Sequence, residues 1–104
     1  MFVAAKDRTS MFNTGMVGYI YIGEDRKTVK AVAGPRETVY RLGIYRSESE
    51  AAAAFRILAG EMEKGRDIVY MPTDEEVEMF MRRENARPER FSRDGKKPVR
   101  RGGS

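Results

Sequence analysis

The sequence predicts an α+β domain: an antiparallel β-meander of about four or five strands packed on one main helix, with a short second helix and a disordered basic tail. Two observations lead to this fold class. The segment Ser47–Gly65 combines a helix-capping box with four consecutive alanines. Ahead of it, short runs rich in aromatic and β-branched residues follow one another at spacings too short for crossover connections, which favours antiparallel pairing.

The main helix is predicted to begin at its capping box. Ser47 and Glu50 have the spacing that lets the hydroxyl accept from a first-turn N–H while the carboxylate reaches back to the Ser47 N–H. Lys64 suits the last turn, and Gly65 suits the left-handed position that ends a helix. Helical periodicity gives an apolar stripe that needs a partner layer: Ala51, Phe55, Leu58 and Met62, flanked by Ala54 and Ala59.

Five segments before this helix are predicted to be extended. Gly23–Arg26 is a hairpin connection, and Gly34–Glu37 is a tight turn with Pro35 at its second position. The clearest strand is the third, which is rich in tyrosine and isoleucine. The predicted strands are Phe2–Ala5, Met11–Phe12, Met16–Ile22, Lys27–Ala33 and Thr38–Tyr45.

Alternate residues of a strand point to opposite faces of its sheet, which assigns the two faces of Thr38–Tyr45. The expected core face is Tyr40, Leu42 and Ile44, and the opposite face is Val39, Arg41 and Tyr45.

A second helix is predicted after a short extended segment, Asp67–Met71, that Pro72 ends. Thr73 and Glu76 repeat the capping-box spacing, so we expect this helix to run to about Glu84. Its expected apolar face is Val77, Phe80 and Met81.

The charge is unevenly distributed along the chain. Residues 85–104 carry seven Lys and Arg against two acids, a net charge of +5, whereas residues 1–84 carry thirteen against fourteen, a net of −1. The last twenty residues also hold too few apolar side chains to order themselves. We therefore expect a single domain at residues 1–84 and a disordered basic tail at residues 85–104.

Two missing residue types restrict the chemistry. Without Cys the chain forms no disulfide, thiolate metal site or cysteine nucleophile, and without His it lacks the commonest general base and transition-metal ligand. We expect no catalytic residues, no metal and no cofactor. No apolar run approaches membrane-spanning length, and the N-terminus lacks the apolar core of a signal peptide, so we expect a cytoplasmic protein without membrane contact.

The order of the elements carries a resemblance. A β-rich part leads into Gly43-Ile44-Tyr45-Arg46-Ser47-Glu48 at the start of an Ala-containing helix, and Tyr70-Met71-Pro72 then precedes acidic residues. Over residues 1–78 the chain resembles small uncharacterised proteins of phages and other mobile elements of Gram-positive bacteria. The resemblance implies a small cytoplasmic accessory protein that binds and modulates a host or phage machine, and it implies no functional residues.

The first candidate site is the sheet face expected to point away from the helices. Aromatic residues beside cations suit a surface that meets another protein or a second copy. The same residues also suit stacking of single-stranded bases, a second packed layer or ordinary cross-strand pairs. The candidate partner-binding residues are Tyr19, Tyr21, Arg41 and Tyr45, with Lys30 beside them.

The second candidate site is the basic tail. Its cations would neutralise phosphates and its aromatic residue would stack on a base, although a tail that only adds solubility has the same composition. The candidate nucleic-acid-binding residues are Arg87, Arg90, Phe91, Arg93, Lys96, Lys97, Arg100 and Arg101.

Three further patterns have ordinary structural explanations. The acidic run Asp74–Glu78 suits a helix N-terminus and lacks the ligand spacing of a calcium loop. Glu61 and Glu63 fall on different faces of their helix, as solvated side chains do. The glycine-containing segments at Gly15 and Gly34 lack the spacing of phosphate-binding loops.

The expected function is therefore that of a non-enzymatic phage or mobile-element accessory protein that binds an unidentified protein and modulates host machinery, with homo-oligomerisation as a further option. The alternative is a nucleic-acid-binding protein that uses the basic tail. An enzyme without His or Cys would need a tuned pocket of other side chains, and no such constellation is recognisable.

Overall fold

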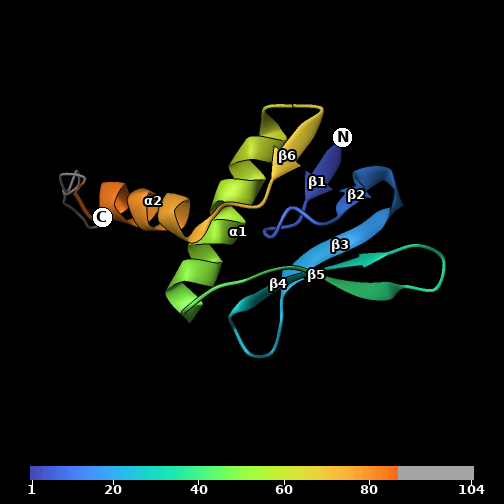
Figure 1. The fold of residues 1–104 in the computed structure, drawn as a ribbon, viewed down its shortest axis with the longest axis horizontal. Helices are drawn as coiled ribbons and strands as arrows, with labels where there is room; N and C mark the ends of the chain where they lie inside the picture. The colour runs from blue at the N-terminus through green and yellow to red at the C-terminus, as the bar shows by residue number, and fades with distance from the viewer. Residues whose placement is uncertain (87–104) are drawn as a thin grey trace, which may run out of the picture.

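A computed structural model describes residues 1–86 as an α+β fold of two small sheets and two helices (Figure 1). The first sheet has the order β2-β1-β6, and the second has the order β3-β4-β5. A short 3-10 turn, η1, lies at Thr14–Met16. The elements are β1 Phe2–Ala4, β2 Met11–Asn13, β3 Val17–Ile22, β4 Thr28–Ala33, β5 Thr38–Ile44, α1 Glu48–Glu63, β6 Ile68–Tyr70 and α2 Asp74–Ala86.

The prediction of a single antiparallel meander is wrong, because only β3, β4 and β5 form one. Strand β1 pairs antiparallel with β2 on one side and parallel with β6 on the other, with Phe2 opposite Ile68 and Ala4 opposite Tyr70. A parallel pair requires a long connection between its strands, and the whole second sheet and α1 provide it here. Short spacings restrict the pairing only of strands that follow each other in sequence. They could not predict the pairing of β1 with β6, because these strands lie more than half the chain apart.

Helix α1 lies in the middle of the fold, with the two sheets on one side and α2 on the other (Figure 1). This position explains why α1 is buried on more than the predicted stripe. Ala51, Ala54 and Leu58 are buried as expected, but Ala53 is buried as well, and Phe55 and Met62 are half-buried. Ala59, expected to flank the stripe, is exposed. The core also contains Val3, Val29, Leu42, Val69, Met71 and Val77.

Of the two predicted capping boxes, the one at α2 forms in full and the one at α1 forms in half. The Ser47 hydroxyl accepts from the Glu50 N–H at 3.1 Å, although the Glu50 carboxylate accepts from the N–H of Arg46 rather than of Ser47. At α2 the exchange is reciprocal: Thr73 Oγ1 accepts from the Glu76 N–H at 3.1 Å, and Glu76 Oε1 accepts from the Thr73 N–H at 2.8 Å. Helix α2 is described to Ala86, so residues 85 and 86, which were assigned to the tail, are helical.

A β-bulge in β5 changes which side chains face the core. Val29 of β4 lies opposite Gly43, but the next residue, Lys30, lies opposite Arg41. Leu42 is therefore an extra residue in β5. Since the side chains of a strand alternate with a period of two, one extra residue moves every later side chain to the other face.

The predicted core face of β5 is therefore only partly correct. Leu42 is buried, but Ile44 is 50% exposed because the bulge turns it to the outer face. Tyr40 lies on the inner side, where its ring packs against Phe12 with centroids 5.0 Å apart, and it remains partly exposed. Tyr45, which was expected on the outer face, is turned inward and buried.

The turn between β3 and β4 is held by one carboxylate. Asp25 accepts hydrogen bonds from the N–H groups of Lys27 and Thr28 at 2.9 and 3.0 Å and from the Thr28 hydroxyl at 2.6 Å. These hydrogen bonds lower the pKa of Asp25 from 3.8 to about 2, with the Thr28 hydroxyl as the largest cause.

We expect Asp25→Asn to be less stable than the wild type at neutral pH, with the difference shrinking in acid. A pKa that is depressed in the folded state adds stability above the unfolded value, and this contribution is lost as the pH falls from 3.8 towards about 2. Urea midpoints of both proteins, measured from pH 7 down to pH 2, test this. Glu24→Gln is the control, because Glu24 accepts none of these hydrogen bonds; a difference for Asp25→Asn that stays constant with pH would contradict the assignment.

Candidate protein-binding surface

The outer face of β3-β4-β5 carries two rows of side chains that run across the strands. The pairing register places Tyr19 opposite Val32 and Val32 opposite Val39, and the same register aligns a second row beside the first. We call these six residues the tyrosine face: Tyr19, Val32 and Val39 in the first row, and Tyr21, Lys30 and Arg41 in the second.

The first row is a small apolar cluster outside the main core. Val32 is only 5% exposed, although it points away from α1 and is not part of the main core. Its neighbours in the row, Tyr19 and Val39, lie directly beside it on the two adjacent strands and are themselves 60% and 51% exposed. The rings of Tyr19 and Tyr21 contact each other at a centroid distance of 5.5 Å. Large apolar groups are thus already gathered on a surface that faces solvent.

The second row adds positive charge to this cluster. Lys30 is half-buried and Arg41 is exposed, and both lie in register with Tyr21. The tyrosine face therefore carries two cations and no carboxylate, a combination that suits a partner with apolar groups and acidic side chains.

Tyr45 is not part of this surface, so the prediction that it shares the face with Tyr19 and Tyr21 is wrong. Its side chain is 2% exposed, and its hydroxyl donates to the Pro72 carbonyl at 2.7 Å. Lys6 Nζ lies 4.3 Å from the centre of its ring. Burial raises the pKa of the Tyr45 phenol, and the negative charge of Asp74 raises it further. Tyr45 therefore joins β5 to the start of α2 and cannot meet a partner.

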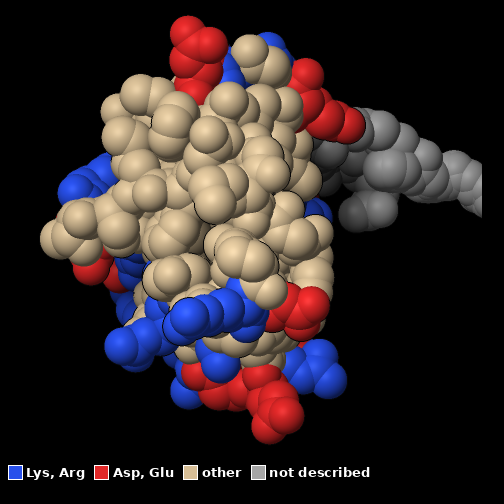
Figure 2. Space-filling view, turned by 90° about the vertical axis from the view of Figure 1, so that its right-hand side faces the viewer, with Lys and Arg blue, Asp and Glu red and all other residues tan. Residues whose placement is uncertain are grey.

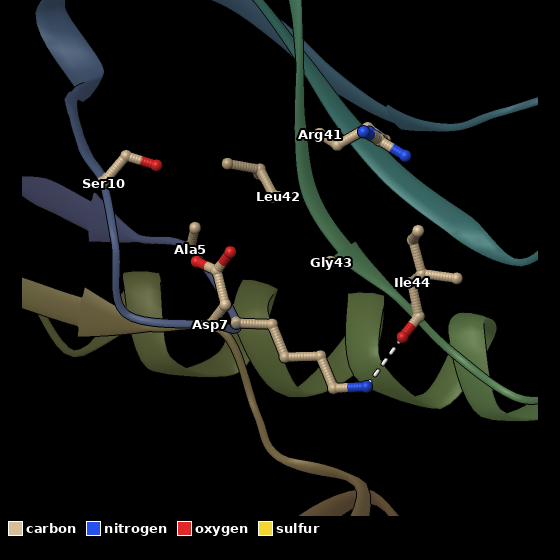
Figure 3. Close-up of a pocket in the computed structure, with 8 residues that line it drawn as sticks. Ala5, Asp7, Ser10, Arg41, Leu42, Gly43 and Ile44 are labelled. Carbon is tan, nitrogen blue, oxygen red and sulfur yellow. Dashed lines mark hydrogen bonds between the residues drawn. The ribbon is translucent and has the colours of Figure 1, made fainter.

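A groove lies beside the free edge of β5 (Figure 3). Residues 5–10 form one wall, with Asp7 and Ser10 across the gap from β5, and Arg41–Ile44 form the other. The groove has a volume of about 660 Å³. Lys6 closes one end, because its Nζ donates to the Ile44 carbonyl at 2.6 Å and pairs with Asp74 at 2.7 Å.

A glycine is required at position 43, because the β5 wall of the groove comes very close there to the segment that follows β1. The Lys6 N–H donates to the Leu42 carbonyl at 2.7 Å, which draws the two backbones together. A Cβ at position 43 would lie 2.9 Å from the Lys6 Cβ and 3.3 Å from the Tyr45 ring. The resemblance segment that begins at Gly43 therefore has a packing role in this fold.

A second apolar surface was not predicted from the sequence. On the face of β2-β1-β6 that points away from the core, Phe2, Met11, Ile68 and Tyr70 are all between 38% and 52% exposed. The sequence contains one indication of this surface. Strands β1 and β6 are apolar at every position, so each places apolar residues on both faces of its sheet. Figure 2 shows the side of the molecule where β2, η1 and the β4–β5 hairpin lie, with a broad uncharged area and charged side chains around it.

Several of the carboxylates expected to have structural roles have partners. Asp74 pairs with Lys6, and Glu76 caps α2. Glu61 pairs with Lys64 at 2.8 Å and with Arg66 at 3.6 Å, and the hydrogen bond from Lys64 lowers the pKa of Glu61. Among residues 1–86, no three acidic side chains gather closely enough to hold a metal ion.

The candidate nucleic-acid-binding residues of the tail lie outside the described residues. They are Arg87, Arg90, Phe91, Arg93, Lys96, Lys97, Arg100 and Arg101.

The fold and this surface together define an α+β domain with an exposed aromatic and cationic sheet face. Comparisons of the chain with family models, with curated proteins and with solved structures find no match. Within residues 1–86, neither α1 nor α2 has the length and apolar character needed to cross a membrane.

Proposed function

We propose that the protein acts by binding another protein through the tyrosine face, as a non-enzymatic accessory protein of a phage or mobile element. The observation that supports this most directly is the first row of that face. There, the buried Val32 lies between two apolar side chains that are themselves more than half exposed. A cytoplasmic location and an effect on host machinery belong to the same proposal.

The tyrosine face would become more stable if a partner covered its exposed apolar side chains. Covering the exposed parts of Tyr19 and Val39 is favourable by roughly 25 cal/mol for each Å² of apolar surface removed from water. Tyrosine and arginine are also the residues most enriched in the energetically dominant parts of interfaces, because they combine a large contact area with a polar group. Arg41 and Lys30 would then select a partner that presents carboxylates around an apolar centre.

Tyr19→Asp is expected to abolish capture of the partner while leaving the fold intact. Tyr19 is 60% exposed, so its replacement changes the free energy of unfolding by little. Aspartate would remove the ring from the apolar first row and introduce a carboxylate that has to lose its hydration on binding. The measurement is a pull-down from host lysate with the full-length chain, with and without nuclease, and thermal melting of each variant.

Met79→Asp is the matched control, because Met79 is 55% exposed and lies on α2, away from the tyrosine face. Wild type and Met79→Asp should capture the same protein whether or not nuclease is present. Capture that survives in a folded Tyr19→Asp variant would end the proposal. Capture that disappears with nuclease would instead favour nucleic-acid binding through the tail.

A further inference from the structure

The backbone groups of β4 point alternately towards β3 and towards β5. The carbonyl of Thr28 and the N–H of Gly34 both bond on the β3 side, at 2.8 and 2.9 Å. Successive residues of an antiparallel strand direct their backbone groups to opposite neighbours. Residues 28, 30, 32 and 34 therefore face β3, whereas Ala31 and Ala33 face β5.

The same alternation shows what the free edge of β5 presents. Ala31 and Ala33 lie opposite Tyr40 and Thr38, so these two residues of β5 bond to β4. Val39 and Arg41 then direct their N–H and carbonyl groups outward. Among residues 1–86, one backbone hydrogen bond lies on this edge, from Lys6 to the Leu42 carbonyl. Residues 38–41 are all exposed, so this stretch can pair with another strand.

We propose that the edge of β5 binds a second copy of this chain, in antiparallel pairing about a two-fold axis at Val39. The two β3-β4-β5 sheets would then form one continuous sheet of six strands. The inference goes beyond the proposed function, because it concerns the edge of the sheet. Of the tyrosine face it uses Val39 and Arg41, and it leaves Tyr19 and Tyr21 free to bind a different protein.

Charge and obstruction select this register. An outward-facing residue must lie opposite another outward-facing residue. An axis at Thr38 would place Val39 and Tyr40 opposite residues of the β4–β5 turn, so the axes within the exposed stretch are Val39, Tyr40 and Arg41. An axis at Arg41 places two guanidinium groups opposite each other, which is unfavourable. An axis at Tyr40 places the second chain against Leu42, where Lys6 already occupies the carbonyl. An axis at Val39 avoids Leu42 and limits backbone pairing to residues 38–41, because the Glu37 N–H already bonds to the Gly34 carbonyl. It also brings the Glu37 side chain of each copy close to the Arg41 side chain of the other, as two opposite-charge pairs.

The same register gives the flanking segments complementary neighbours. In this register, the turn that contains Arg36 of one copy continues from the paired strands towards the groove beside β5 of the other copy. The far wall of that groove carries Asp7. The Asp7 carboxylate is held in place by hydrogen bonds from the N–H and hydroxyl of Thr9, at 3.0 and 2.7 Å. On the outer face, the two Val39 side chains become neighbours, so the first rows of both tyrosine faces join into one surface.

Charge reversal tests the register directly. Glu37→Arg and Arg41→Glu should each weaken dimerisation by about tenfold or more, because each replaces two attractive pairs by two repulsive ones. The double variant Glu37→Arg/Arg41→Glu should restore it. Position 37 has φ 52°, and arginine already adopts such a backbone at Arg8 and Arg26, so the substitution adds no unusual strain. The measurement is sedimentation of the full-length chain over a concentration series.

Two further variants complete the test. Lys27→Glu makes a comparable charge change in the β3–β4 turn and should leave the dimer unaffected. Val39→Pro removes an outward N–H without removing a bond to β4, so it should give a folded monomer. A wild-type monomer throughout the series would overturn the inference, and so would dimers that single reversals do not weaken or that the double variant does not restore. Tyr19→Asp should remain dimeric, which separates this result from that of the lysate pull-down.

Discussion

Leu58→Asp is expected to leave the protein unfolded under conditions in which the wild type is folded. Leu58 is 2% exposed and lies on α1, between the sheets and α2. A carboxylate there would be buried among apolar side chains without a partner, at a cost of several kcal/mol. The total stability of a domain of this size is only about 5–15 kcal/mol.

Leu58→Ala provides a graded version of the same measurement. It should lower the free energy of unfolding by about 2–5 kcal/mol in urea titrations followed by circular dichroism. Ala59→Asp is the matched control, because position 59 is the neighbouring residue of the same helix and is exposed. Its cost should be limited to the lower helix propensity of aspartate, within about 0.7 kcal/mol. A folded Leu58→Asp variant with unchanged melting would contradict the placement of α1.

Tyr45→Ala is expected to have the second-largest effect, a loss of about 3–5 kcal/mol, as for other buried aromatic residues. Tyr45→Phe retains the ring but removes the donor to the Pro72 carbonyl and should cost about 1–3 kcal/mol. Urea titrations of both variants give these values.

Tyr19→Phe is the control for the hydroxyl, since Tyr19 is 60% exposed and its hydroxyl donates no hydrogen bond within residues 1–86. Its stability should lie within about 0.5 kcal/mol of the wild type. If Tyr45→Phe were equally neutral while Tyr19→Phe was destabilising, the assignment of Tyr45 to the core and Tyr19 to the surface would be reversed.

The candidate surface could be predicted in part. Tyr19, Tyr21, Lys30 and Arg41 share one face because β3 and β4 are joined by a short turn, and strand alternation then determines which side chains align. The second apolar surface, on β2-β1-β6, was missed because it exists only once β6 has paired with β1.

The sequence by itself determined the local elements of this protein. Both helices begin at their predicted hydroxyl caps, Ser47 and Thr73, and Pro35 lies at the second position of a turn closed by the Glu37 N–H and the Gly34 carbonyl. These features depend on groups a few residues apart, so local patterns were sufficient.

Only the tertiary structure decided the division into two sheets and the position of Tyr45. The parallel pair β1–β6 joins residues from the two ends of the domain, and no local pattern specifies such a contact. The bulge at Leu42 lies where Lys6 comes close to Gly43, and there the glycine leaves space and the Leu42 carbonyl accepts from the Lys6 N–H. One extra residue then reverses the faces of Ile44 and Tyr45, because the side chains of a strand alternate with a period of two.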